Sequence, residues 1–132
     1  KMHYEIILMI QPTSPMRTKK DIVNCIKILV KNKASSVWSV NKVDKKFNPL
    51  KQLNITRKGV LKHIDSRGKK IIARQQLGDT YIRNGICYAI SRNTILKEKS
   101  IMGKKCYHYL IKKPVVNIDN YNELNLVRKI LK

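Results

Sequence analysis

Apolar residues follow two spacings along the chain, and these spacings predict strands and helices. Residues 4–10 read YEIILMI, a short continuous apolar run typical of a strand buried on both faces of a parallel sheet. Thr18 and Asp21 form a helix-capping pair, and apolar residues then recur at helical spacing over 22–30. Residues 36–43, SVWSVNKV, predict the next strand. Strand, helix and strand in this order indicate the right-handed crossover of an α/β sheet.

The pattern changes between residues 47 and 82. Short apolar pieces (LNI, VLKHI, KIIA) are separated by RKG and DSRG, which are turn signals between antiparallel strands. We therefore expect an inserted β-hairpin over 47–82. The remaining expected elements are a buried strand over 85–90, a short helix over 94–99, extended segments over 106–111 and 115–118, and a last helix capped by Asn120 and Glu123, with Leu124, Val127 and Leu131 on one face.

Composition narrows the class of protein. The chain has 132 residues and is 42% hydrophobic, which suits one domain with a single core. Its 29 Lys and Arg residues against 8 Asp and Glu residues give a formal charge of +21. The cations are scattered in twos and threes, which indicates solvated faces rather than a basic tail. Aromatic residues make up only 6%, and no recognition or stacking motif occurs, so nucleic acid is an unlikely partner.

The cysteines and the apolar runs bear on the compartment. Cys25, Cys87 and Cys106 lack the two-residue spacing of a zinc or redox pair, so we expect reduced, mostly buried thiols. No stretch approaches the roughly 18 apolar residues that cross a bilayer, and the first residues do not resemble a signal peptide. A soluble cytoplasmic protein without a membrane partner is expected.

The most informative polar segment is 11–17, QPTSPMR, which follows the first strand and precedes the first helix. Ligands bind at this position in open α/β sheets. Two prolines stiffen the segment, while Gln11, Thr13 and Ser14 offer hydrogen-bond donors and acceptors. Residue chemistry alone predicts a binding loop or, equally, a merely rigid turn.

This segment, followed by a capped helix, resembles the QPTSPLR segment of the acylneuraminate cytidylyltransferases, also called CMP-sialic acid synthetases. SVWSV, NPLKQL, ARQQL, YIRNGICYAI and VVNID resemble further stretches of that family in the same order. The resemblance spans nearly the whole chain. It implies a doubly wound, Rossmann-like nucleotidyltransferase sheet, in which 47–82 is a dimerisation arm of a homodimer.

The resemblance also implies a reaction. The anomeric hydroxyl of a sialic-acid-like, nine-carbon sugar acid attacks the α-phosphate of CTP, pyrophosphate leaves, and a CMP-sugar remains. Such a displacement needs cations near the phosphates, a carboxylate that holds Mg²⁺, and polar groups that orient the hydroxyl.

Within the first loop, the resemblance assigns substrate binding to four residues. Gln11 matches a glutamine that contacts the bound substrates in the family. Thr13, Ser14 and Arg17 share its loop, although the two hydroxyls can equally cap local backbone groups.

Four further residues are assigned to the substrates. Lys51 and Arg74 match basic residues that the family directs toward the neighbouring subunit's site, and Arg74 is the candidate for a catalytic role; either can instead be a solvated surface charge. Asn84 and Gly85 fall in an RNG turn that is expected to enter a strand, and Asn84 matches a substrate-site asparagine. A plain tight turn is the alternative.

Asp119, at the end of VVNID, is the expected catalytic carboxylate and Mg²⁺ ligand, because hard divalent ions prefer carboxylate oxygen. A helix-capping aspartate is the alternative. Many family members have a second aspartate two residues earlier, where this chain has Asn117. Asn117 can coordinate through its amide oxygen, but more weakly than a carboxylate.

One family feature has no counterpart among the 132 residues. The family's Gly-rich loop with Lys and Arg, which wraps the triphosphate, is missing, and the five glycines here are isolated. We therefore expect an N-terminally truncated, C-terminal part of such an enzyme, inactive by itself. A non-catalytic dimer partner and a basic nucleic-acid-binding module are the alternatives.

Overall fold

The computed structural model describes residues 3–131, which divide into two compact units. The first unit takes in the chain up to Asn41 and again from Arg83, and the second unit is Lys42–Ile82. The segment 47–82, expected as an insertion, lies inside the second unit. Each unit is described by itself.

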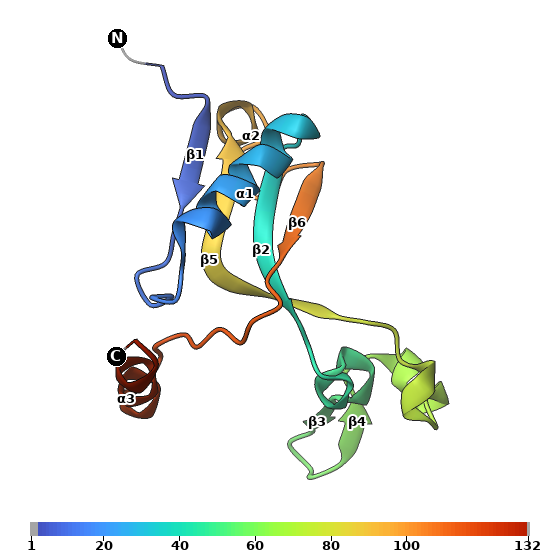
Figure 1. The fold of residues 1–132 in the computed structure, drawn as a ribbon. Coiled ribbons are helices and arrows are strands. Elements are labelled where there is room, and N and C mark those ends of the chain that lie inside the picture. Colours follow the sequence, from blue (N-terminus) through green and yellow to red (C-terminus); the bar gives the residue numbers. More distant parts are fainter. Residues whose placement is uncertain (1–2, 132) are drawn as a thin grey trace. The chain divides into compact units, whose positions relative to one another are not determined.

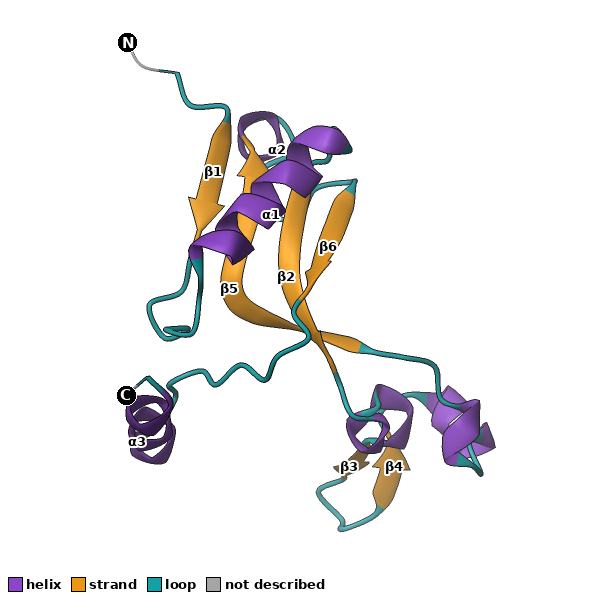
Figure 2. Ribbon diagram, viewed as in Figure 1, coloured by secondary structure: helices purple, strands orange, loops and turns teal. Residues whose placement is uncertain are grey.

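The first unit is built on a four-stranded sheet with the order β1-β5-β2-β6 (Figure 1). β1 is antiparallel to β5, and β2 is parallel to β6. β5 runs against the other three strands, so the sheet is mixed and the unit is α/β (Figure 2). The strands are β1 (Ile6–Met9), β2 (Ser36–Lys42), β5 (Tyr81–Ser91) and β6 (Cys106–Leu110).

The prediction for β1 was wrong in two respects. This strand pairs antiparallel with β5, with Ile6 opposite Ser91, and it is the outermost strand on its side of the described sheet. Ile7 and Leu8 are 37% and 39% exposed, so the strand is not buried on both faces. A run of apolar residues indicates that a strand can be buried, but it does not indicate the direction or the number of the neighbouring strands.

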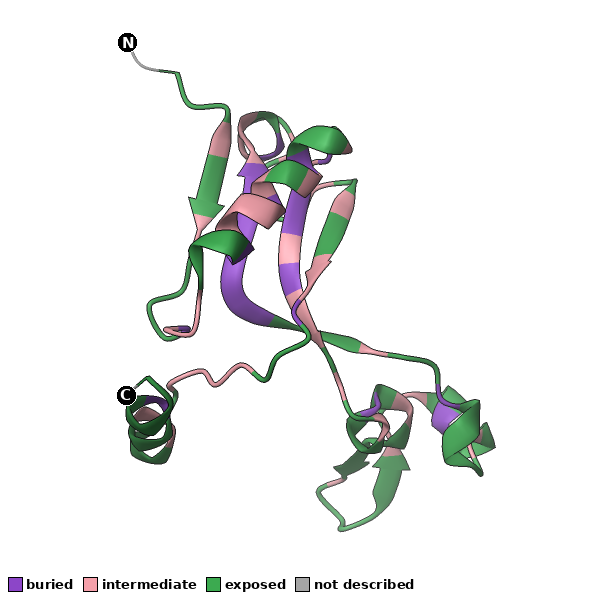
Figure 3. Ribbon diagram, in the orientation of Figure 1, coloured by how far each residue is buried: buried purple, intermediate pink, exposed green. Residues whose placement is uncertain are grey.

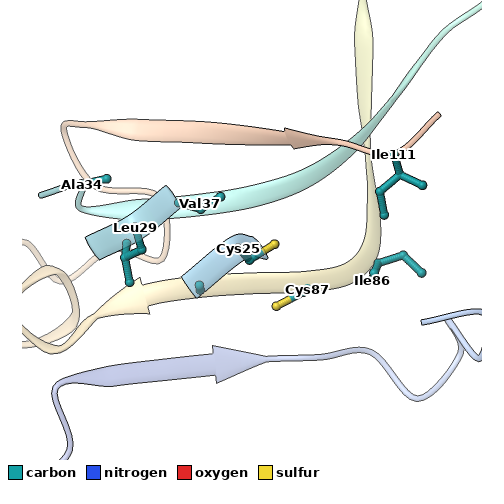
Figure 4. Packing of buried hydrophobic residues seen from close by; sticks show 8 residues of the cluster. Cys25, Leu29, Ala34, Val37, Ile86, Cys87 and Ile111 are labelled. Atoms are coloured by element: carbon teal, nitrogen blue, oxygen red, sulfur yellow. The ribbon is translucent and has the colours of Figure 1, made fainter. Parts of the chain in front are cut away.

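The helix α1 (Lys19–Lys31) covers one face of the sheet (Figures 1 and 2). Its predicted capping box is confirmed, because Thr18 Oγ1 accepts from the Asp21 backbone N–H and the Asp21 carboxylate accepts from the Thr18 N–H. Burial concentrates where α1 meets the middle strands (Figure 3). The core cluster, drawn in Figure 4, comprises Cys25, Leu29, Ala34, Val37, Ile86, Cys87, Ala89 and Ile111.

The opposite face of β2 meets the segment that follows the short helix α2 (Arg92–Leu96). Ser36 and Trp38 alternate with Val37, so they point away from α1. Ser36 Oγ donates to the Met102 carbonyl, and Trp38 Nε1 donates to the Ile101 carbonyl at 3.2 Å. The sheet therefore has covering segments on both faces at this end.

The other helices of the first unit also begin at side-chain caps. α2 (Arg92–Leu96) begins two residues before the predicted helix, because the Ser91 hydroxyl accepts from a backbone N–H of its first turn. α3 (Tyr121–Ile130) has the predicted capping box of Asn120 and Glu123. Its apolar face is narrower than predicted, since Val127 is its buried residue. No helix within residues 3–131 is long and apolar enough to cross a membrane.

The second unit contains a small hairpin, β3 (Leu53–Ile55) with β4 (Leu61–His63), joined through the predicted RKG turn. The prediction of a strand at KIIA, residues 70–73, is wrong. Its flanks form 3-10 helical turns, because the Gln76 side chain accepts the N–H groups of Ile72 and Ala73 and so occupies donors that a strand partner would need. The 3-10 turns of this unit are Lys45–Phe47, Pro49–Lys51, Ser66–Lys70 and Arg74–Gln76.

Candidate functional site

The polar loop 11–17 is tied to the middle of β5. The Gln11 backbone N–H donates to the Gly85 carbonyl at 3.2 Å, and the Ser14 N–H closes a turn on the Gln11 carbonyl at 3.1 Å. Arg17 Nη1 lies 3.2 Å from both the Gln11 and the Ile86 carbonyl oxygens. These bonds hold the loop at one place on the strand, so its exposed side chains have a defined position.

Asn84 and Gly85 lie within β5 rather than in a turn that precedes it, which corrects the sequence prediction. Gly85 has a φ of 71°, a conformation that favours glycine. A Cβ at this position would collide with the Gln11 side chain and would lie 2.7 Å from Ser14 Oγ. Gly85 thus lets the loop lie directly against the strand, with the Gln11 amide over it.

The Asn84 side chain is buried, with 4% of the residue exposed, and holds β5 to β2. Its Oδ1 accepts from Ser39 Oγ at 2.6 Å and from the Ile86 N–H at 3.2 Å. Its Nδ2 donates to Asn41 Oδ1 at 2.7 Å. One N–H of the amide remains for a ligand, so Asn84 serves mainly to position its neighbours.

Ser39 and Asn41 are functional candidates that sequence reasoning missed. Both are polar residues in β2, and the Asn41 amide also donates to the Ile111 carbonyl at 2.7 Å. The signal that could have found them is the presence of Ser and Asn inside the otherwise apolar run SVWSVNKV. A buried polar side chain in a strand needs a partner, and that partner is usually another polar residue nearby.

Ser14 joins three segments of the chain. It is fully buried, and its Oγ lies 3.1 Å from the Asn84 carbonyl and 2.9 Å from Asn117 Oδ1. The hydroxyl therefore does not face solvent. Of the residues predicted to bind substrate in this loop, Gln11 and Thr13 are exposed, Arg17 is half-buried, and Ser14 is a connecting residue.

The segment before α3 lies against the same loop. The Ile118 N–H donates to the Thr13 carbonyl at 2.8 Å, and the segment 115–118, expected to be extended, forms no strand of the described sheet. Asp119 follows and is exposed. Its carboxylate makes no hydrogen bond or ion pair within residues 3–131, and the helix cap is supplied by Asn120 instead. The carboxylate is therefore available for a ligand.

Asn117 and Asp119 offer oxygen donors of the kind that a magnesium ion takes. Asp119 offers a free carboxylate, and Asn117 Oδ1, which already accepts from Ser14, has a second lone pair. Mg²⁺ is commonly bound by one or two carboxylates together with water and substrate phosphates. The described part of the chain contains no cluster of three or more His, Cys, Asp or Glu residues that could hold a metal. Phosphate oxygens would have to supply most of the remaining ligands.

A buried carboxylate supports the far end of the loop. Burial raises the pKa of Asp21, but hydrogen bonds from Thr18, the charge of Lys113 and a hydrogen bond from Tyr109 outweigh it and leave the pKa below its ordinary value. Lys113 Nζ lies 3.8 Å from the carboxylate and donates to the Met16 carbonyl at 3.1 Å. Lys113, which sequence reasoning also missed, therefore links the loop to α1.

Lys51 and Arg74 lie in the second unit, where the structure places both on one cavity of about 240 Å³. Arg74 Nη2 is 2.9 Å from Asp44 Oδ1, so part of its charge is already neutralised. A backbone hydrogen bond from Lys46 and then the charge of Arg74 lower the pKa of Asp44. The rest of the cavity lining is Leu50, Leu53, His63, Gly68, Ile71, Ile72, Ala73 and Leu77.

The first unit thus brings its predicted residues together through direct contacts. Gln11 packs on Gly85, Ser14 joins Asn84 to Asn117, and the backbone of Thr13 holds the residue before Asp119. Comparison with models of protein families finds no match, and comparison with curated proteins finds none either.

Proposed function

We propose that this chain carries the sugar-acid side of a cytidylyltransferase site similar to that of the acylneuraminate cytidylyltransferases. The supporting observation is the contact of the Ser14 hydroxyl with both the Asn84 carbonyl and Asn117 Oδ1. Asn84 and Asn117 lie 70 and 103 positions after Ser14 in the sequence, and the single buried Ser14 hydroxyl holds both against one loop. A merely rigid turn would not need partners from two other, distant segments.

In this proposal the exposed side chains of the loop bind the sugar acid. The Gln11 amide can both donate to and accept from sugar hydroxyls, and Thr13 adds a hydroxyl. Arg17 supplies positive charge at the inner end of the loop. The buried residues Ser14 and Asn84 keep these groups in place, which reduces the ordering that binding would require.

Asp119 and Asn117 are the proposed magnesium ligands. When bound, the ion would neutralise charge on the phosphates of CTP. The Asp119 side chain is exposed, and Asn117, two residues earlier, is held by Ser14. With one carboxylate rather than two, we expect weak metal affinity in the absence of nucleotide.

The finer features of the fold belong to the same proposal. A Rossmann-like, doubly wound sheet would fit the mixed sheet of the first unit. A cytoplasmic homodimer that uses the second unit as its arm would fit the exposed apolar residues of that unit. The exposure of Ile72 reaches 94%. Lys51 and Arg74 would meet the anions of a neighbouring subunit. The other exposed apolar residues of the second unit include Phe47, Leu53, Ile55, Val60, Leu61 and Ile64.

Binding of the sugar acid is tested on the chain itself. A ¹⁵N-labelled sample is titrated with N-acetylneuraminate, and amide shifts are followed by NMR. We expect the amide resonances of Gln11, Thr13 and Gly85 to shift. The amide resonance of Gly103, which lies near the opposite end of β5, should not change and serves as the control. Equal shifts at both glycines, or none at millimolar sugar, would contradict the proposal.

The reaction is tested by pyrophosphate release from CTP in the presence of Mg²⁺ and the sugar acid. The chain is assayed alone and after extension with the Gly-rich basic loop that the resemblance implies. We expect turnover only in the extended protein, and Asp119→Asn should reduce it by about 100-fold or more. Asp79→Asn removes an exposed carboxylate of the second unit and is the matched control. Absence of pyrophosphate release from the extended protein would refute the catalytic part of the proposal.

A further inference from the structure

The cavity of about 240 Å³ in the second unit is lined by residues of that unit alone. The apolar side chains of its lining are Leu50, Leu53, Ile71, Ile72, Ala73 and Leu77. Leu77 is only 2% exposed, so it belongs to the inner part of the lining. Lys51 and Arg74 are the Lys and Arg residues of the lining, and no Asp or Glu is among the described residues that line it. The cavity therefore combines an apolar surface with positive charge.

Gly68 lets one wall of the cavity pack closely. The residue is buried, and a Cβ at this position would collide with the Leu50 carbonyl oxygen and would lie 2.7 Å from His63 Nδ1. Because glycine has no side chain, the turn Pro49–Lys51 and the strand β4 lie directly against the turn Ser66–Lys70. His63 Nδ1 is buried in this wall without a hydrogen-bond partner in residues 3–131. Three packed segments thus form the wall, so the cavity is a built feature of the folded unit.

The two cations of the lining differ in their partners. Both side chains belong to exposed residues. Arg74 is paired with Asp44, whereas Lys51 Nζ forms no salt bridge within residues 3–131. A lysine ammonium group offers three donors to an anion. A carboxylate that enters the cavity can therefore pair with Lys51 without displacing an acidic side chain.

We propose that this cavity binds a small carboxylate with an apolar body, such as a medium-chain fatty acid or an aryl carboxylate. The apolar body packs against Leu77 and its apolar neighbours, and the carboxylate pairs with Lys51 and Arg74. Sites for small ligands are commonly lined by apolar side chains, with a few polar groups that fix the orientation of the ligand. The inference goes beyond the proposed function, because an apolar lining would leave the many hydroxyls of a sugar acid without partners.

Charge favours this ligand over the same unit of a second copy. The carboxylates of Asp44, Asp65 and Asp79 are already paired with cations of their own unit. The same unit of a second copy would therefore bring excess positive charge to the cavity, which like charges disfavour. A small anion lowers the positive charge there instead.

Binding is tested by titrating the ¹⁵N-labelled chain with octanoate at constant ionic strength, without sugar or nucleotide. We expect the amide resonances of Gly68, Ala73 and Leu77 to shift along one shared, saturable curve at millimolar concentration or below. Gly59 is the control, because it lies beside Arg57 and Lys58 but does not line the cavity. Its resonance reports general attraction of anions to positive charge. Equal shifts at Gly59, or none at the cavity, would overturn the proposal.

Two other ligands separate the contributions of charge and apolar contact. Butanoate has the same carboxylate on a shorter chain, and each buried CH₂ group raises affinity about fourfold. Octanoate should therefore bind at least about tenfold more tightly than butanoate. 1-Octanol keeps the chain without the charge and should bind more weakly than octanoate. Equal affinities of octanoate with either of these ligands would contradict the proposed site.

Variants at exposed positions locate the ligand. Ala73→Phe places a ring in the cavity and should weaken octanoate binding at least about tenfold. Gln75→Phe adds the same ring at an exposed residue outside the lining and should leave binding unchanged. Lys51→Gln should weaken binding about two- to fivefold, whereas Lys58→Gln, at the hairpin turn, should have no effect.

Two outcomes of these experiments would refute the site. One is octanoate binding that Ala73→Phe leaves unchanged. The other is self-association of the chain that closes the cavity to octanoate, which would make a second copy the occupant. None of the measurements involves sugar or nucleotide, so their failure would leave the proposed enzyme activity untouched, and the failure of that activity would leave this site untouched.

Discussion

Gly85 shows how one residue without a side chain can organise a site. Its positive φ and the contact with Gln11 both occur inside a strand, where sequence alone suggested a turn. The side chain of the neighbouring Asn84 is hydrogen-bonded to Ser39 and Asn41. At this scale the structure brings Gln11, Ser14 and Asn84 into contact with their neighbours in the loop and in β5, and Ser14 and Asn84 are buried rather than exposed to a ligand.

Gly85→Ala tests this role of the glycine. We expect a loss of about 2–4 kcal/mol in the free energy of unfolding, since the alanine would have both an unfavourable φ and a collision with Gln11. Gly59→Ala is the matched control, because Gly59 has a φ of 77° but nothing within 4 Å of an added Cβ. It should cost only about 1 kcal/mol. Urea unfolding measures both, and equal losses would contradict the proposed contact.

Among the elements, α1 is the one whose beginning matters most to the site. Its capping box joins Thr18 to Asp21, and Tyr109 donates to the same carboxylate at 3.2 Å. Lys113 adds an ion pair from the segment after β6. The helix start is thereby fixed to the outermost strand on the other side of the sheet, and the loop before the helix is fixed with it.

Asp21→Asn tests this anchorage through its pH dependence. The folded-state pKa of Asp21 is below its ordinary value, so the ionised group stabilises the fold above the unfolded pKa of about 3.9. That stability is lost as the pH falls through the folded value. At pH 7 the variant should be less stable by about 1–2 kcal/mol, and the difference should shrink toward pH 2.

The control for this series is Glu5→Gln, which changes an exposed carboxylate whose side chain has no hydrogen bond or ion pair within residues 3–131. Its stability relative to the original chain should stay the same from pH 7 to pH 3. The anchorage would be contradicted if the loss caused by Asp21→Asn were equally independent of pH in thermal unfolding.

At the scale of the whole molecule, positive charges far outnumber negative ones. All three carboxylates of the second unit already pair with cations of that unit, Asp44 with Arg74, Asp65 with Arg67, and Asp79 with Lys42. Such exposed pairs contribute at most about 1 kcal/mol each. The 29 cations against 8 anions of the chain leave a charge of +21, which repels itself.

The stability of the chain should therefore rise with salt. We expect the melting temperature to increase by several degrees between about 20 mM and 500 mM NaCl, because the Debye length falls from roughly 20 Å to below 5 Å. Screening also weakens the ion pairs, but they are far fewer than the repulsive contacts. Sorbitol at matched osmolality is the control for effects unrelated to charge. A melting temperature that falls with salt would show that ion pairs dominate instead.

Local patterns in the sequence were sufficient to determine the capped helices α1 and α3, the middle strands and the RKG hairpin, because each depends on residues within a few positions of one another. They also identified the polar loop. Only the tertiary structure decided the direction of β1 and its outer position in the described sheet, the place of Asn84 and Gly85 inside β5, and the burial of Cys25 and Cys87 in one core cluster. These depend on pairing between segments dozens of residues apart, and such pairing is selected by the free energy of the whole core rather than by any local pattern.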